Sequence, residues 1–325
     1  MPTIKDVAER AGVSVTTVSR VLNNRGYISQ ATRTKVYQAM EELDYQPNEV
    51  ARSLFRKRSK IIGLIVPTVA HPFFGELTSY LETYAYSRGY KVLICNSQLD
   101  ASKEQEYIGM LRRNQVDGII MASHTLEVEE YKKLSLPVVA FDRFISSRIP
   151  YVTSDNYQGG KLAVELLLEK GCKKIAHMCG SLDLDMLANQ RHRAVLDLAQ
   201  EKNVPCFTVE TDINVFEIIK YEELLTELLT EHPDIDGLFL NSDIMAIAAM
   251  KVCRKLGKRV PEDLKIIGYD DVSLASLVSP QITTIRQPLA QMSELSVRLI
   301  ENLVAGKPVE VENCLPVKLV ERETT

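Results

Sequence analysis

The sequence predicts two kinds of folded unit in one chain: a small all-α helix-turn-helix head, and an α/β body of two doubly wound lobes. Short apolar runs recur at helical spacing near the N-terminus, and after Lys60 continuous apolar strands alternate with amphipathic helical stretches. The first 60 residues are basic, whereas the remainder is acidic. With 325 residues, of which 45% are hydrophobic, the chain can build more than one core.

The head is predicted from two short apolar runs that break at Gly12. Gly12 can adopt the positive φ that a tight corner between two helices requires, and Ser14 can cap the second helix. A third helix is expected to begin at a cap on Ser29 and to extend to Tyr45, which closes a three-helix core. This pattern predicts a helix-turn-helix domain over residues 1–46.

The second helix of the head has a face that suits DNA. It begins with the small side chains of Val15, Thr16 and Thr17, and Ser19 and Arg20 follow on its outward side. Residues 1–60 contain 11 Lys and Arg against 6 Asp and Glu, whereas the rest of the chain contains 28 against 37. Charge alone would fit a solvated basic face, but charge and helix pattern together favour DNA over a small bundle without a ligand.

The body contains nine apolar runs typical of buried strands. They are IIGLIV, YKVLIC, DGIIMA, PVVAF, YVTSD, KKIAHM, DGLFLN, LKIIGYDD and ITTI. Because helices of ten or more residues separate most of them, we expect parallel sheets covered on both faces. Nine strands are too many for one mid-sized sheet, which favours two lobes with a ligand site at the carboxyl ends of their strands.

Several classes of protein are excluded or disfavoured. No apolar run is long enough to span a bilayer, and Asp6, Glu9 and Arg10 interrupt the place of a signal peptide, so we expect a cytoplasmic protein without a membrane partner. The six cysteines and five histidines are dispersed, which predicts neither a disulfide framework nor a metal site. The motifs GxxxxGK[ST], GxGxxG, GxSxG and HExxH are missing, so no catalytic residue and no cofactor is expected.

The stretch TIKDVAERAGVSVTTVSRVLN, together with YQPNEVARSL at residues 45–54, resembles the DNA-binding head and hinge of the LacI/GalR family of bacterial repressors. The resemblance implies that the second helix enters the major groove of operator DNA. Val15, Thr16 and Arg20 would then read bases, while Thr17 and Ser19 would hold phosphates or pack.

The resemblance also implies a hinge and linker at residues 47–60, in which a helix orders on DNA and inserts a leucine into the minor groove. The matching residues are Asn48, Ala51, Arg52 and Leu54. So short a helix is not stable alone, and an apolar wedge is a known minor-groove device. The alternative for Leu54 is a buried position between domains.

For residues 61–325 the resemblance implies an effector-binding and dimerisation domain with the fold of periplasmic sugar-binding proteins. The chain of that fold crosses between the lobes three times. We therefore expect a first lobe of about 61–160 and 291–320, and a second lobe of about 161–290 and 321–325. Dimerisation would use the helical stretches Phe74 to Tyr86 and Met292 to Leu303 of the first lobe.

Polar side chains follow the predicted strands at the edge where a ligand would bind. They are His71, Asp142, Arg143, Ser154 to Asn156, Arg191, Asn241 to Asp243 and Asp270, with Phe73 and Phe74 as an aromatic floor. Carboxylates, amides and arginine suit sugar hydroxyls, which both donate and accept hydrogen bonds.

The resemblance assigns effector contact to His71 or Phe73, Arg143, Arg191 and Asp270, with Asn156 and Asp243 nearby. Asp142 is added on its place after a strand, whereas Asp271 is expected to cap a turn. The family's Arg-x-x-Gly is replaced here by Arg191-His192-Arg193-Ala194, which leaves open whether Arg191 or Arg193 points inward.

The expected function is a homodimeric transcriptional repressor of a sugar operon, which binds operator DNA and responds to a sugar or sugar phosphate. The alternative is a cytoplasmic sugar-binding enzyme of the doubly wound class, because a fold does not fix a function. The runs ICNSQ and NQVDGII resemble sucrose-operon repressors, whereas PNEVARSL and HPFF resemble ribose-operon repressors. A sucrose- or fructose-type effector is therefore expected first and ribose second. The sequence leaves open whether the sugar induces or corepresses, and whether a phosphocarrier protein takes part.

Overall fold

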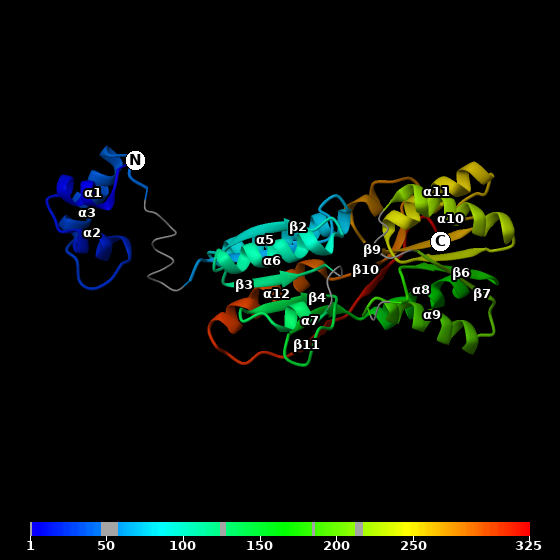
Figure 1. The fold of residues 1–325 in the computed structure, drawn as a ribbon. Coiled ribbons are helices and arrows are strands. Elements are labelled where there is room, and N and C mark those ends of the chain that lie inside the picture. The colour runs from blue at the N-terminus through cyan, green and yellow to red at the C-terminus, as the bar shows by residue number, and fades with distance from the viewer. Residues whose placement is uncertain (1, 47–57, 124–127, 184–185, 212–216) are drawn as a thin grey trace. The chain divides into compact units, whose positions relative to one another are not determined.

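The computed structural model describes residues 2–46, 58–123, 128–183, 186–211 and 217–325. The chain divides into two compact units, Met1–Ser59 and Lys60–Thr325, the head and the body (Figure 1). None of the described helices is long and apolar enough to cross a membrane.

The head contains three helices around a small apolar core. They are α1 (Ile4–Ala11), α2 (Val15–Leu22) and α3 (Gln30–Glu42). Gly12 ends α1 with a φ of 65°, and the Ser14 hydroxyl accepts a hydrogen bond of 3.1 Å from the backbone N–H of Thr17 at the start of α2. Both features agree with the expected corner. The buried side chains are Val7, Ala8, Val18, Val21, Val36 and Ala39.

The third helix is three residues shorter than the pattern suggests. The Ser29 hydroxyl caps it as expected, accepting from the N–H of Thr32 at 3.3 Å. The helix ends at Glu42, because Asp44 turns the chain through a φ of 46° and the N–H of Tyr45 bonds back to Met40. Tyr45 still packs on the core from outside the helix.

The first lobe of the body has a six-stranded parallel sheet in the order β11-β5-β4-β3-β1-β2. Its strands are β1 (Ile61–Val66), β2 (Lys91–Asn96), β3 (Gly118–Met121), β4 (Val138–Phe141), β5 (Tyr151–Ser154) and β11 (Glu312–Leu315). Helices α5 (Pro72–Ser87) and α12 (Leu289–Val304) cover one face, and α6 (Ala101–Arg113) and α7 (Val128–Lys132) cover the other.

The second lobe has a six-stranded sheet in the order β12-β10-β9-β8-β6-β7, parallel except for its edge strand β12. Its strands are β6 (Ile175–Cys179), β7 (Cys206–Glu210), β8 (Gly237–Leu240), β9 (Lys265–Asp270), β10 (Thr283–Arg286) and β12 (Lys318–Val320). Helices α8 (Asn156–Glu169) and α9 (Asn189–Glu201) pack on one face, and α10 (Ile218–Glu231) and α11 (Asp243–Leu256) on the other. A 3-10 turn, η1 (Ser273–Ser276), follows β9.

The described strands include three that no continuous apolar run predicts: β7, β11 and β12. Each lies at the edge of its sheet, and its residues are only partly buried or exposed. An edge strand needs no continuous run of apolar side chains, because it contacts the core from one side only.

The chain crosses between the lobes three times, as expected, but two crossings come earlier than predicted. Residues 156–160 form the start of α8, whose Gly160 lies so close to α9 that a Cβ there would meet the carbonyl oxygen of Arg191 at 2.5 Å. Residues 318–320 form β12, in which Leu319 pairs with Ile285 of β10. Both segments therefore belong to the second lobe, and assigning them to the first was wrong.

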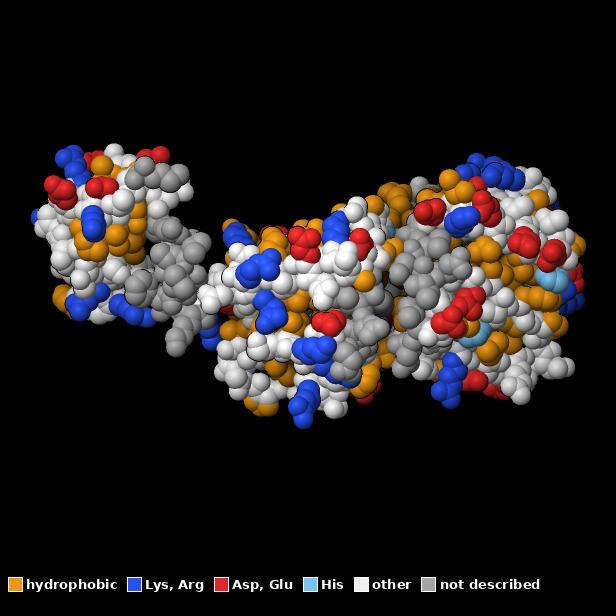
Figure 2. Space-filling view, viewed as in Figure 1, with side chains coloured by type: hydrophobic (Ala, Val, Ile, Leu, Met, Phe, Trp, Pro, Cys, Tyr) orange, Lys and Arg blue, Asp and Glu red, His pale blue; other side chains and the backbone are white. Residues whose placement is uncertain are grey.

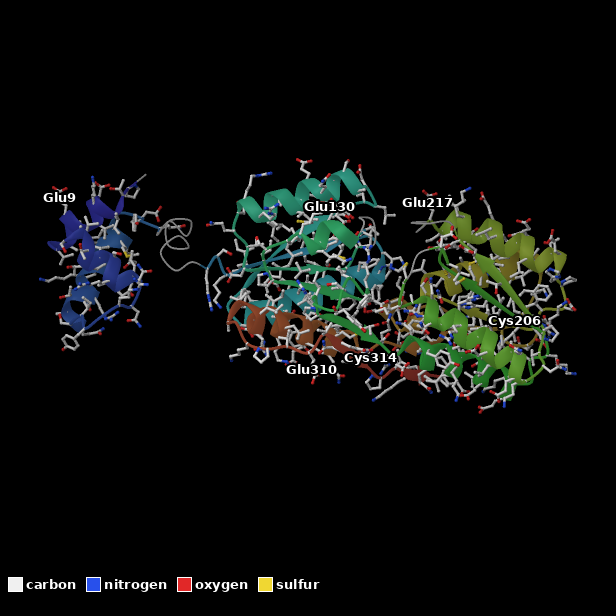
Figure 3. All side chains as sticks on the ribbon, turned by 60° about the horizontal axis from the view of Figure 1, so that its bottom comes forward. Glu9, Glu130, Cys206, Glu217, Glu310 and Cys314 are labelled. Atoms are coloured by element: carbon white, nitrogen blue, oxygen red, sulfur yellow. The ribbon has the colours of Figure 1, made fainter. Side chains whose placement is uncertain are left out.

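Described cysteines occur in both lobes without a disulfide. Cys206 on β7 and Cys314 on β11, both labelled in Figure 3, belong to different lobes.

Candidate functional site

A cleft lies between the two lobes, at the carboxyl ends of their strands. From the first lobe it is lined by His71, Phe73, Phe74, Phe141 and Asp142, among others. From the second lobe the lining includes Arg191, Asn241, Ser242, Asp270 and Gln287. Five of the eight predicted effector residues therefore meet here: His71, Phe73, Asp142, Arg191 and Asp270.

Arg191 is held rigidly at the start of α9. Only 5% of its surface is exposed, and its guanidinium carbon lies 3.5 Å from the ring centroid of Tyr269. Its Nε donates to Asn156 at 2.7 Å and its Nη1 donates to the carbonyl oxygen of Asn241 at 3.1 Å. Arg193 instead lies 71% exposed beside Asp197. Arg191 is therefore the arginine that points inward.

Two carboxylates, one from each lobe, line the cleft with Arg191 and interact with its charge. The Asp142 carboxylate lies 3.9 Å from Nη2 of Arg191 and accepts a hydrogen bond of 2.6 Å from the Thr153 hydroxyl. The Asp270 carboxylate accepts a hydrogen bond of 2.8 Å from the Gln287 amide. Burial raises the pKa of both, that of Asp270 to about 7, although the charge of Arg191 opposes the shift.

Both aspartates adopt positive φ angles, 52° at Asp142 and 104° at Asp270. Residues other than glycine rarely do so, and such backbone strain occurs preferentially at ligand sites. Both residues lie at the end of a strand and line the cleft.

Aromatic rings form the apolar part of the first lobe's wall. The ring of Phe73 lies 5.1 Å from that of Phe74 and 6.4 Å from that of Phe141, measured between centroids. His71 occupies the N-cap position of α5, and burial lowers its pKa to about 4, which keeps the imidazole neutral at pH 7. Carboxylates that accept, an arginine that donates and an aromatic wall can together bind a ligand rich in hydroxyl groups.

The other three predicted effector residues lie behind the lining of the cleft. Asn156 bridges Arg191 and Asp142, to whose carboxylate it donates at 3.1 Å. Arg143 donates to the carbonyl oxygen of Ser123 at 3.2 Å. Asp243 is fully buried and accepts from the N–H of Val272 at 2.8 Å. These side chains support the wall of the cleft.

Two polar contacts of the cleft escaped prediction. Gln287, the first residue after β10, donates to Asp270 and accepts a hydrogen bond of 2.7 Å from the hydroxyl of Ser154, which ends β5. Its place after a predicted strand was the available signal. Tyr269, inside a predicted strand, gave no signal for its stacking on Arg191.

Asp271 does not line the cleft, because Arg286 and Arg322 bind its carboxylate at 2.5 and 2.6 Å.

In the head, the predicted base-reading residues share an exposed surface. Val15, Thr16 and Arg20 are exposed on α2, and Thr16 and Arg20 lie one helical turn apart. Thr17 and Ser19 are half-buried and bond to the neighbouring Ser14 and Asn23. Lys and Arg side chains lie at several separate places on the head (Figure 2), so charge alone does not mark one binding face.

The predicted hinge contacts Asn48, Ala51, Arg52 and Leu54 lie outside the described residues. Their roles stay predictions.

The comparisons with known proteins agree with this arrangement. Residues 3–48 match the family described as bacterial regulatory proteins, lacI family, and residues 164–325 match the periplasmic binding protein-like domain. The ribose operon repressor of Halalkalibacterium halodurans is 42% identical over 326 residues, which span 100% of this chain and 97% of that protein. The chain belongs to the LacI family.

Other similar proteins cover between 82% and 100% of the chain. The sucrose operon repressor of Pediococcus pentosaceus is 41% identical and covers 98% of each chain. The lac repressor dimer bound to operator and the anti-inducer ONPF is 29% identical, with a TM-score of 0.88 over 100% of this chain and 99% of that one. A regulator from Alkaliphilus metalliredigens complexed with D-xylulofuranose is 35% identical, with a TM-score of 0.75 over 82% of this chain and 99% of that one. The predicted family and fold class are confirmed.

Proposed function

We propose that this LacI-family protein is a sugar-responsive repressor, whose head binds operator DNA and whose cleft binds the sugar. Its relatives are named as repressors of ribose and sucrose operons. Within this chain, the strongest support is the buried guanidinium of Arg191, which lines the cleft together with one carboxylate from each lobe. Sugar binding would change the orientation of the two lobes relative to each other, and thereby whether the hinges order on DNA.

We infer that the effector is a neutral sugar rather than a sugar phosphate. Among the described residues that line the cleft, Arg191 is the one Lys or Arg, and two aspartates accompany it. A phosphate group would face both carboxylates at close range. A neutral sugar can donate its hydroxyls to these carboxylates and accept from Arg191. A sucrose- or fructose-type sugar and ribose stay the candidates.

Calorimetric titration of the full chain tests this proposal. Ribose, fructose and sucrose are compared with ribose 5-phosphate and fructose 6-phosphate, and we expect one neutral sugar to bind once per chain and to change the affinity for operator DNA. Binding confined to a phosphorylated sugar would contradict the neutral-sugar assignment. Consumption of the sugar in the same samples would favour the alternative, an enzyme.

DNA recognition is tested on a duplex recovered by selection from random sequences. Arg20→Ala should lower affinity for the selected site by about tenfold to a hundredfold and weaken discrimination between sites. Lys35→Ala, on α3, is the matched control and should weaken selected and unrelated DNA by similar factors. Equal behaviour of the two variants would contradict base reading by Arg20.

We further propose that two copies pair through α5 and α12 of the first lobe. Tyr80 and Tyr86 on α5 are 40% and 62% exposed, which leaves aromatic surface for a partner. A dimer also presents two heads to two half-sites. Sedimentation should find a dimer in wild-type protein and a weaker one in Tyr86→Glu.

A further inference from the structure

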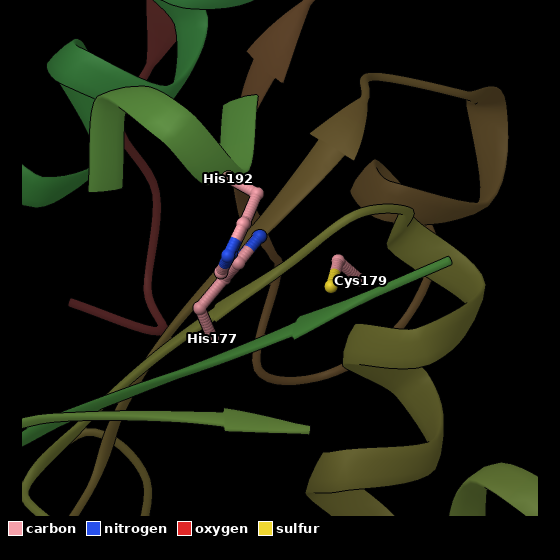
Figure 4. A group of neighbouring side chains, drawn as sticks. All are labelled: His177, Cys179 and His192. Carbon is pink, nitrogen blue, oxygen red and sulfur yellow. The ribbon is translucent and has the colours of Figure 1, made fainter. Parts of the chain in front are cut away.

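Three side chains with metal-binding chemistry meet in the second lobe. His177 and Cys179 lie two residues apart on β6 and so project from the same face of the sheet, and His192 lies in the first turn of α9. Figure 4 shows the three side chains side by side, and one ligand atom of each lies within 4.8 Å of the others. No such cluster was predicted, because His and Cys are dispersed along the sequence and these three meet only where α9 packs on β6.

Two imidazole nitrogens in this cluster are buried without a partner. Among the described residues, neither Nε2 of His177 nor Nδ1 of His192 makes a hydrogen bond. Nδ1 of His177 lies 3.1 Å from the carbonyl oxygen of Phe239. A carbonyl only accepts, so Nδ1 donates its proton there and Nε2 keeps its lone pair. Histidines that bind metals are commonly oriented in this way.

The rings are fixed by packing. His177 is fully buried and lies against Phe239 on one side, with centroids 4.9 Å apart, and against His192 at 5.6 Å, with the two imidazole planes 15° apart. A buried lone pair that lacks a donor destabilises the fold unless something occupies it. Water, a proton or a metal ion would serve, and the neighbouring thiol favours the metal ion.

We propose that His177, Cys179 and His192 bind a thiophilic metal ion with a filled d shell, Zn²⁺ or Cu⁺. Two imidazoles and one thiolate are a ligand set that both ions accept, and Zn²⁺ commonly takes three protein ligands and leaves a fourth position open. On binding, the ion replaces the proton of Cys179, which leaves to solvent. The carboxylate of Glu210 acts electrostatically on both Cys179 and His192, and it offsets the charge of the ion.

The separation of the three ligand atoms means that metal binding requires only small movements of their side chains. Because the three atoms lie within 4.8 Å of one another, an ion at their centre would lie at most about 2.8 Å from each, against bonds of about 2.1 Å to nitrogen and 2.3 Å to sulfur. Each ligand therefore moves inward by at most roughly 0.5 to 0.7 Å. His192 is half-buried at a helix start and has the most room to do so.

The site lies directly behind the wall of the cleft. Cys179 is followed by Gly180 and Ser181, and His192 is preceded by Arg191, and all three of these neighbours line the cleft. An ion would tie the end of β6 to the start of α9 and so fix Arg191. We therefore expect the ion to alter sugar affinity, an effect that rests on the proposed function, whereas metal binding itself does not.

The test uses full-length, untagged, reduced protein titrated with Zn²⁺ in one arm and with Cu⁺ under argon in the other. We expect one ion per chain in at least one arm, and Co²⁺ in place of Zn²⁺ should give a thiolate-to-metal absorption band. Cys179→Ser and His192→Gln should each weaken binding by about a hundredfold or more, which is at least the loss typical of changes around a metal site.

Cys253→Ser and His232→Gln are the matched controls, a buried cysteine and a histidine elsewhere in the second lobe, and should bind like wild type. Melting curves without metal establish whether each variant is folded. If Cys179→Ser does not fold, the metal affinity of His192→Gln tests the site. Wild-type affinity in a folded His192→Gln protein would overturn the site. Sugar affinity that does not change with saturating metal would overturn only the coupling to the cleft.

Discussion

The two lobes repeat one strand order, with β1, β2, β3, β4, β5 and β11 of the first matching β6, β7, β8, β9, β10 and β12 of the second. The repeat places Asp142 after β4 and Asp270 at the end of the matching β9, both with positive φ. It also places His71 and Arg191 at the starts of α5 and α9, the helices that follow β1 and β6. Equivalent positions of the two lobes therefore line one cleft from two sides.

The difference between the lobes lies in what occupies these equivalent positions. The first lobe offers a neutral imidazole and aromatic rings, whereas the second offers a guanidinium tied to three partners. The shared topology places one carboxylate in each lobe. Among the described residues that line the cleft, the second lobe alone provides an arginine, Arg191. We infer that the second lobe orients the sugar and that the first closes over it.

The largest expected effect comes from removing that donor. Arg191→Ala should weaken sugar binding by about a hundredfold or more, because it removes a charged hydrogen-bond partner and leaves two buried carboxylates without their cation. Calorimetry measures the loss, and a gel shift should find operator binding retained. The control is Arg193→Ala, which changes an exposed arginine two residues away. Equal losses in the two variants would contradict the assignment.

The two aspartates offer a matched comparison between the lobes. Asp270→Asn and Asp142→Asn should each reduce sugar affinity by about tenfold to a hundredfold, since each exchanges a charged acceptor for a neutral amide. If the second lobe orients the sugar, Asp270→Asn should have the larger effect. A larger effect of Asp142→Asn, with both proteins folded, would reverse the roles that we infer for the lobes.

Much of this arrangement could be predicted from the sequence, and there are identifiable reasons why the remainder could not. Gly12, Ser14 and the buried strands carry local signals, because turn geometry, capping and burial each restrict the residue type. Arg191 and the aspartates could be placed at the cleft because parallel strands end at one edge.

A polar residue after a strand does not reveal which way it points. Asn156 and Asp243 follow strands as Asp142 does, yet they support the wall of the cleft from behind. The cluster of His177, Cys179 and His192 was missed because its members are brought together by tertiary structure rather than by spacing. The edge strands β7, β11 and β12 were missed because their weak burial leaves no apolar run.

A smaller effect should appear in the pH dependence of stability. Asp270 has a pKa of about 7 in the folded protein, above its ordinary value of 3.8. Between these values the folded state holds a proton that the unfolded state has lost, so stability falls as the pH rises from about 4 to 7. Asp270→Asn mimics the protonated form. Asp270→Asn does not titrate at this position, so its free energy of unfolding minus that of wild type should be larger at pH 8 than at pH 5 in urea titrations. An equal difference at both pH values would contradict the raised pKa.

The smallest expected effect concerns the hydrogen bond that joins two crossings between the lobes. Ser154, at the end of β5, donates to Gln287, which in turn holds Asp270. Ser154→Ala should lower the free energy of unfolding by about 1 kcal/mol, because the buried Gln287 oxygen loses its donor. Ser296→Ala is the control, since that buried serine donates to Met292 within its own helix. If the bond between the crossings also positions Asp270, Ser154→Ala should weaken sugar binding severalfold while Ser296→Ala leaves it unchanged. Equal sugar affinities in the two variants would show that the hydrogen bond stabilises the connection between the lobes without shaping the cleft.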